Sequence, residues 1–202
     1  RLWTASYFAL TGGLYVKFVR YMLPIVPPLA TLAAAGLSRL LALPRFPRIA
    51  GGVLVAVTLI TTILNGLAFV RVYDGQHPWL TASRWIYDNA PAGAFIVGEY
   101  WDDRLPLDID AALTRDRYRL VEVQPYEEPD SPEKLAGMLE GLAGSDYVVF
   151  PTHRLWGTIP RWPERYPLTT RYYQALFDGR LGYRLEFFAA RYPRLGPITL
   201  MD

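Results

Sequence analysis

RYMLPIVPPLATLAAAGLSRLLAL, residues 20–43, is the stretch that decides how the rest of the chain is organised. It carries no charge from Tyr21 to Ser38. A helix rises about 1.5 Å per residue, so about 20 apolar residues cross the roughly 30 Å hydrocarbon core of a bilayer. Three prolines lie near its start, where missing backbone donors cost least, and Ala33–Gly36 offers a small-residue face. The stretch predicts a transmembrane helix; a helix buried in a large soluble core is the alternative.

Apolar segments also lie on both sides of this stretch. Residues 49–73 contain a second uncharged run of spanning length, which predicts another membrane helix, with Asn65 bonded to a neighbouring helix. Residues 2–16 are apolar but short for a full span, so they predict a partial helix. Because the chain begins at Arg1 inside this apolar segment, we expect it to be a fragment of a longer membrane protein.

Charge separates the chain into two parts. Residues 1–76 hold seven Lys or Arg and one Asp, a net of +6, whereas residues 77–202 hold 14 Lys or Arg and 18 Asp or Glu, a net of −4. We therefore predict membrane helices over 1–76 and a water-soluble domain over 77–202. The net charge of +2 gives no support for nucleic-acid binding. The absence of cysteine excludes disulfides, and two histidines far apart make a zinc site unexpected.

The second part alternates short strands with amphipathic helices, which favours a small α/β domain with a mainly parallel sheet. The helix signals include a Ser131 cap followed by Pro132. The predicted strands are 94–100, 118–123, 147–150 and 183–189, and the predicted helices are 80–89, 131–144 and 169–177.

Acidic side chains follow the first strand of this domain, at the end where α/β folds often place their sites. Glu99, Asp102 and Asp103 are therefore candidates for a site, although a solvated acidic turn that caps a helix explains them as well. His153-Arg154 is a weaker candidate for ligand binding. Glu127, Glu128 and Asp130 are predicted to lie in an exposed loop. There is no phosphate-binding glycine loop and no serine nucleophile motif.

Lys17, Arg20 and Tyr21 form the candidate site that we favour. Two cations and a phenol at the start of a membrane helix can hold a phosphate at the boundary between membrane and water. The alternative is that the two cations reach toward lipid headgroups as ordinary flanking residues. A second mixture of cations and aromatic rings, residues 161–173, can bind nucleic acid or sugars, but packing against a membrane or a neighbouring domain explains it better.

The string KFVRYMLPIVPPLATLAAAGL, residues 17–37, resembles late transmembrane helices of GT-C membrane glycosyltransferases, the superfamily of protein O-mannosyltransferases and aminoarabinose transferases. WIYDNAPAGAFIVGEYWDDRLP (85–106) and SDYVVFPTHRLWGTIPRWPERYPLTTRYYQALFDGRLGY (145–183) are similar to the domain that follows the last helix in bacterial members. The resemblance covers most of the chain at the level of motifs.

The resemblance implies a multi-pass plasma-membrane enzyme of the cell envelope that transfers a sugar from a polyprenyl-phosphate donor to an extracytoplasmic acceptor. Lys17, Arg20 and Tyr21 would then lie near the donor phosphate. Counting Lys and Arg in the connections gives a tie for orientation; the resemblance places Arg45 in the cytoplasm and residues 77–202 outside. It also places the catalytic acidic residue upstream of Arg1. We expect no cofactor, and no metal site in these residues.

Two other function classes remain open. The chain could be a non-enzymatic sensor or assembly domain anchored in the membrane, or part of a transporter. A transporter is disfavoured because the interiors of the predicted helices carry no charge.

Overall fold

A computed structural model describes residues 2–13, 19–43 and 47–200, apart from the side chains of residues 19 and 48. The chain divides into two compact units, Arg1–Leu67 and Ala68–Asp202, and each is described by itself.

The first unit is helical. Helix α1 spans Leu2–Gly13, the 3-10 helix η1 spans Val19–Ile25, and α2 spans Val26–Leu41. The helix predicted over residues 20–43 therefore begins as a 3-10 helix. Prolines cause this change, because Pro24 lies inside η1 and two further prolines occupy the first turn of α2, where a missing N–H costs least. Helix α3, Arg48–Val70, follows, and its last residues already belong to the second unit.

Among the described residues, two helical runs are long and apolar enough to cross a membrane: Arg20–Leu41 and a run that starts at Ile49. In α3 the exposed side chains include Ile60, Ile63 and Leu67, each more than half exposed. Such a surface is suited to hydrocarbon and not to water.

The polar side chains of these helices bond to their own backbone. In α3 the hydroxyls of Thr58, Thr61 and Thr62 each donate to the carbonyl four residues earlier, at 2.8, 2.8 and 2.7 Å. Asn65 Nδ2 donates to the carbonyl of Thr61 at 2.8 Å, so its described partner lies in its own helix and not in a neighbouring one. Satisfying polar groups within a segment is what a hydrocarbon environment requires.

The second unit contains a three-stranded parallel sheet in the order β2-β1-β3, as the predicted parallel pairing requires. Strand β1 spans Phe95–Glu99, β2 spans Arg119–Val123 and β3 spans Tyr147–Val149. The central strand pairs on both edges: Val97 lies opposite Val121 of β2 and Val148 of β3.

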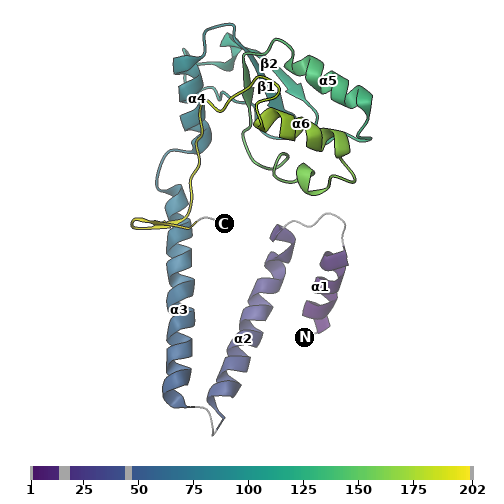
Figure 1. The fold of residues 1–202 in the computed structure, drawn as a ribbon. Helices are drawn as coiled ribbons and strands as arrows, with labels where there is room; N and C mark the ends of the chain where they lie inside the picture. Colours follow the sequence, from purple (N-terminus) through teal and green to yellow (C-terminus); the bar gives the residue numbers. More distant parts are fainter. Residues whose placement is uncertain (1, 14–18, 44–46, 201–202) are drawn as a thin grey trace. The chain divides into compact units, whose positions relative to one another are not determined.

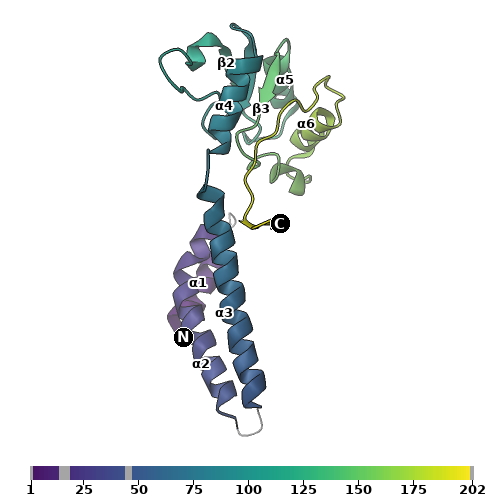
Figure 2. The same ribbon diagram turned by 90° about the vertical axis from the view of Figure 1, so that its left-hand side faces the viewer.

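Helices cover both faces of this sheet (Figures 1 and 2). Helix α4, Pro78–Asn89, packs on one face, and α5, Pro132–Leu142, and α6, Pro167–Phe177, pack on the other. Side chains alternate along β1, so Ile96 enters the core beside α4 and Val97 enters the core beside α5 and α6. Ser131 caps α5 by accepting from the backbone N–H of Lys134, as the sequence predicts.

The side chain of Asp130 is buried, which contradicts the prediction that Asp130 lies in an exposed loop. Its carboxylate accepts hydrogen bonds from the backbone N–H groups of Leu168 and Thr169 at 2.7 and 3.2 Å and from the Thr169 hydroxyl, and thus holds the start of α6. Lys134 Nζ lies 3.1 Å from the carboxylate, and the two side chains are 7% and 3% exposed. Burial by itself raises the pKa of Asp130, but these donors outweigh it and hold the pKa below its ordinary value.

Residues 183–189, predicted as a fourth strand, form no strand, and that prediction is wrong. Within the described residues, no backbone hydrogen bond joins this segment to β3. Side chains hold it instead: the Tyr183 hydroxyl donates to the carbonyl of Leu142 at 3.1 Å, and the Phe187 ring stacks on Trp85 at 5.1 Å. Leu185 is 82% exposed, so the inward face of the segment is covered only in part, at Tyr183 and Phe187. We call residues 183–193 the strap; Figure 1 shows it running beside α4.

After the strap, the chain forms a short antiparallel hairpin. Its strands are β4, Arg194–Leu195, and β5, Ile198–Thr199, and they turn at Gly196, whose φ of +55° favours glycine.

Asp130→Ala should lower the free energy of unfolding by about 3–5 kcal/mol, because it removes the cap of α6 and leaves the Lys134 ammonium buried without a counter-charge. Urea denaturation of the chain in detergent, followed by near-UV circular dichroism, measures this change. Asp178→Ala is the matched control, since Asp178 pairs with Arg180 on the surface and both side chains are 63% exposed; it should cost under about 1 kcal/mol. Equal effects of the two substitutions would contradict a supporting role for Asp130.

Candidate functional site

The predicted phosphate site is partly described. Arg20 and Tyr21 lie in η1, at the start of the apolar run, whereas Lys17 lies outside the described residues. Both described side chains are exposed, and the Arg20 guanidinium carbon lies 5.7 Å from the centroid of the Tyr21 ring. A guanidinium and a phenol hydroxyl on neighbouring residues offer several hydrogen-bond donors to an anion.

Tyr7 of α1 supports this part of η1. Pro24 has no N–H, so it cannot donate to the carbonyl of Tyr21 three residues earlier, as a 3-10 helix would require. The Tyr7 hydroxyl donates to that carbonyl at 3.0 Å. The sequence alone did not identify Tyr7, although a proline three residues after Tyr21 was a signal that this carbonyl needed another donor.

The carboxyl edge of the sheet brings several of the other candidates together. Glu99, the last residue of β1, is 6% exposed, so it is not part of a solvated turn. Its carboxylate accepts a hydrogen bond from the Tyr173 hydroxyl of α6. Burial raises the pKa of Glu99 to about 7; the hydrogen bond from Tyr173 lowers it somewhat, and the charge of Asp102 raises it.

Asp102 and Arg154 also meet at this edge, although they are 52 positions apart in sequence. Arg154 Nη1 lies 3.2 Å from Asp102 Oδ1, and the Thr152 hydroxyl donates to Asp102 Oδ2. The backbone of Trp101 between Glu99 and Asp102 has a φ of +146°, a conformation that costs a tryptophan free energy and that occurs preferentially at functional positions. His153 lies against the ring of Trp156, 6.1 Å between centroids, and does not join this group.

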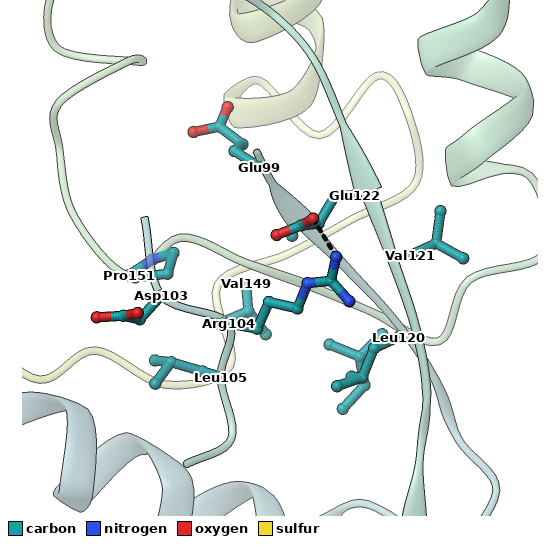
Figure 3. A pocket seen from close by; sticks show the side chains of 11 residues that line it. Glu99, Asp103, Arg104, Leu105, Leu120, Val121, Glu122, Val149 and Pro151 are labelled. Atoms are coloured by element: carbon teal, nitrogen blue, oxygen red, sulfur yellow. Dashed lines mark hydrogen bonds and ion pairs between the residues drawn. The ribbon is translucent and has the colours of Figure 1, made fainter. Parts of the chain in front are cut away.

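Figure 3 shows the pocket beneath these residues. The Glu99 carboxylate points away from the ion pair between Arg104 Nη2 and Glu122 Oε2, which are 2.5 Å apart, and Asp103 lies on the opposite wall beside Pro151. The cavity volume of about 10 Å³ leaves room for about one water molecule. This pocket is therefore too small for a substrate, and among the described residues no set of three or more His, Asp or Glu side chains could hold a metal ion.

In the mixture of cations and aromatic rings in residues 161–173, three tyrosines belong to the domain core, whereas Trp162 is 51% exposed and the three arginines are exposed. Tyr166, Tyr172 and Tyr173 are each at most 4% exposed. Arg165 pairs with Glu128, and the Tyr166 hydroxyl donates to the same carboxylate at 2.6 Å. These three tyrosine rings cannot stack on a nucleic-acid base or a sugar, because they pack within their own domain.

In the comparisons with known proteins, no protein-family model, no curated protein and no solved structure matches the chain.

Glu99→Gln should stabilise the chain at neutral pH. The native pKa of about 7 lies above the ordinary value of 4.5, so the folded state binds the proton more tightly than the unfolded state. The contribution of Glu99 to the free energy of unfolding is therefore most favourable below pH 4.5. It falls as the pH rises from 4.5 to 7 and then levels off. Between low and high pH, this contribution to the free energy of unfolding changes by about 3 kcal/mol.

Urea denaturation of wild type and Glu99→Gln from pH 5 to pH 8 measures this effect, with Glu140→Gln on the exposed face of α5 as the control for loss of one carboxylate. The wild type should lose stability over this range relative to Glu99→Gln. If the wild type and Glu99→Gln lost stability in parallel from pH 5 to pH 8, Glu99 would already be ionised at pH 5 in the folded protein, and its pKa would not be raised.

Proposed function

We propose that this chain is the C-terminal part of an integral-membrane glycosyltransferase that uses a polyprenyl-phosphate sugar donor, and that Lys17, Arg20 and Tyr21 hold the donor phosphate. The observation that carries the proposal is the position of Arg20 and Tyr21 at the first turns of a 22-residue apolar helical run. The resemblance of residues 17–37 to such transferases supports it.

The chemistry of the donor fits this position. A polyprenyl phosphate keeps its chain in hydrocarbon and its phosphate at the boundary with water, so a protein can contact that phosphate where an apolar helix begins. Arginine is suited to the contact because its planar fork can donate two parallel hydrogen bonds to phosphate oxygens. The bond from Tyr7 to the carbonyl of Tyr21 holds the backbone that carries these donors.

Arg20→Ala should weaken binding of a polyprenyl phosphate about tenfold to hundredfold, because a charge-assisted contact contributes about 1.5–3 kcal/mol. Arg20→Lys should recover part of the affinity, since lysine keeps the charge but lacks the fork. The measurement is the concentration dependence of crosslinking between a photoreactive polyprenyl-phosphate analogue and residues 17–24 of the chain in nanodiscs.

Arg39→Ala is the matched control, because Arg39 is an exposed cation near the other end of the same helix. If Arg20 and Arg39 were both ordinary flanking cations, their replacement would change crosslinking equally and little. That result would leave Arg20 as a membrane anchor and remove the basis of the proposal.

The proposal also fixes a topology, with Arg45 on the cytoplasmic side and residues 77–202 outside. The chain contains no cysteine, so single cysteines at position 45 and at the exposed position 140 can be labelled without background. In intact cells an impermeant thiol reagent should label position 140 and not position 45. Because position 130 is buried in the fold, position 140 is the better reporter. Labelling of position 45 alone would reverse the assignment.

A further inference from the structure

A groove in the second unit lies where α3 ends. It is bounded by residues 71–81 on one side and by the strap and the hairpin on the other, and its volume is about 450 Å³. Its walls carry both cationic and aromatic side chains. They include Arg71, Gln76, Thr81, Phe188, Arg191 and Arg194.

Two of the three arginines in this groove have no carboxylate partner among the described residues. Arg71 pairs with Asp74 at 3.0 Å, so its charge is balanced. Arg191 donates from Nε to the carbonyl of Gln76 at 2.9 Å, which fixes its guanidinium over Gly75 without neutralising it. Arg194 makes no ion pair with any described carboxylate. The groove therefore carries a positive charge that the described residues leave uncompensated.

Exposed apolar side chains border these cations. Phe188, Tyr192 and Ile198 are 66%, 44% and 61% exposed, and they alternate with Arg191 and Arg194 along the strap and the hairpin. Aromatic rings interleaved with cations are typical of protein segments that lie in the headgroup layer of a bilayer. An inorganic anion would leave these apolar side chains without a partner, whereas a lipid satisfies both kinds of group.

The position of the groove directly after the apolar helix α3 also favours a lipid as the ligand. Arg71 directly follows α3, whose 23 residues make a helix about 35 Å long, enough to cross the hydrocarbon core. With α3 across a bilayer, Arg71 as the first residue after this helix would lie at the level of lipid headgroups. Phosphate is the anionic group common to those headgroups, and arginine is the side chain best matched to it.

We infer that this groove binds the phosphate of an anionic membrane lipid through Arg191 and Arg194, separately from the site at Arg20. The ligand is a phosphate with an apolar tail, supplied either by an anionic phospholipid or by a polyprenyl phosphate. This inference goes beyond the proposed function, because it holds whether or not the chain belongs to a transferase.

The test is native mass spectrometry of the delipidated chain in detergent, titrated separately with phosphatidylglycerol, a polyprenyl phosphate, phosphatidylcholine and inorganic phosphate. The double variant Arg191→Ala/Arg194→Ala should weaken binding of the lipid phosphate about tenfold to hundredfold at one site. The matched control is Arg180→Ala/Arg184→Ala, which removes the same charge from exposed positions of the same unit that pair with Asp178 and Glu186.

The arms of the experiment separate the sources and the two proposals. Tighter binding of phosphatidylglycerol identifies bulk phospholipid as the ligand, and tighter binding of polyprenyl phosphate identifies the carrier lipid. Arg20→Ala should leave binding at the groove unchanged, so loss of one site does not decide the other. Equal losses in the test and control variants, equal affinity for phosphatidylcholine, or binding of inorganic phosphate as tight as that of the lipids would overturn the inference. Because Arg191 also holds the strap, Arg194→Glu provides a second variant. It should lose binding of the lipid phosphate while its near-UV circular dichroism spectrum stays like that of the wild type.

Discussion

Strand β1 is enclosed on four sides, and the second unit is built around that enclosure. Its two edges pair with β2 and β3, and its two faces send Ile96 and Val97 into separate cores, where they are 1% and 0% exposed. A strand without a free edge or a wet face must be apolar along its length, which explains the run AFIV just before Gly98 and Glu99. It also requires helices on both faces, which α4 on one side and α5 and α6 on the other supply.

Two carboxylates with buried side chains in the second unit behave in opposite ways. Asp130 receives hydrogen bonds from two backbone N–H groups, a hydroxyl and an ammonium, so its pKa falls although burial opposes ionisation. Glu99 receives one bond from Tyr173, and burial dominates, so its pKa rises to about 7. The number of donors around a buried carboxylate thus decides whether it is a structural anion or a group that can exchange a proton near neutral pH.

Local signals in the sequence predicted most elements of the second unit. Ser131 with Pro132 identified α5, and the apolar runs identified three parallel strands, because these patterns act over a few residues. The errors arose where distant residues decide the outcome. Asp130 looks exposed beside Pro129 until α6 brings Leu168 and Thr169 to it, and residues 183–189 have the alternation of a strand but are held by Tyr183 and Phe187. The support that Tyr7 gives to Tyr21 was missed for the same reason.

The apolar helices restrict where this chain can bind an anion. A charge inside a membrane helix is costly, and α3 contains none from Ile49 to Val70, where its hydroxyls and its amide bond to their own backbone. Cations can therefore stand only where these helices begin or end. Arg20 precedes one apolar run, and Arg71 follows the other and opens the groove that holds Arg191 and Arg194. A bilayer around these apolar runs would therefore meet the cations at headgroup level, where the phosphates of membrane lipids lie.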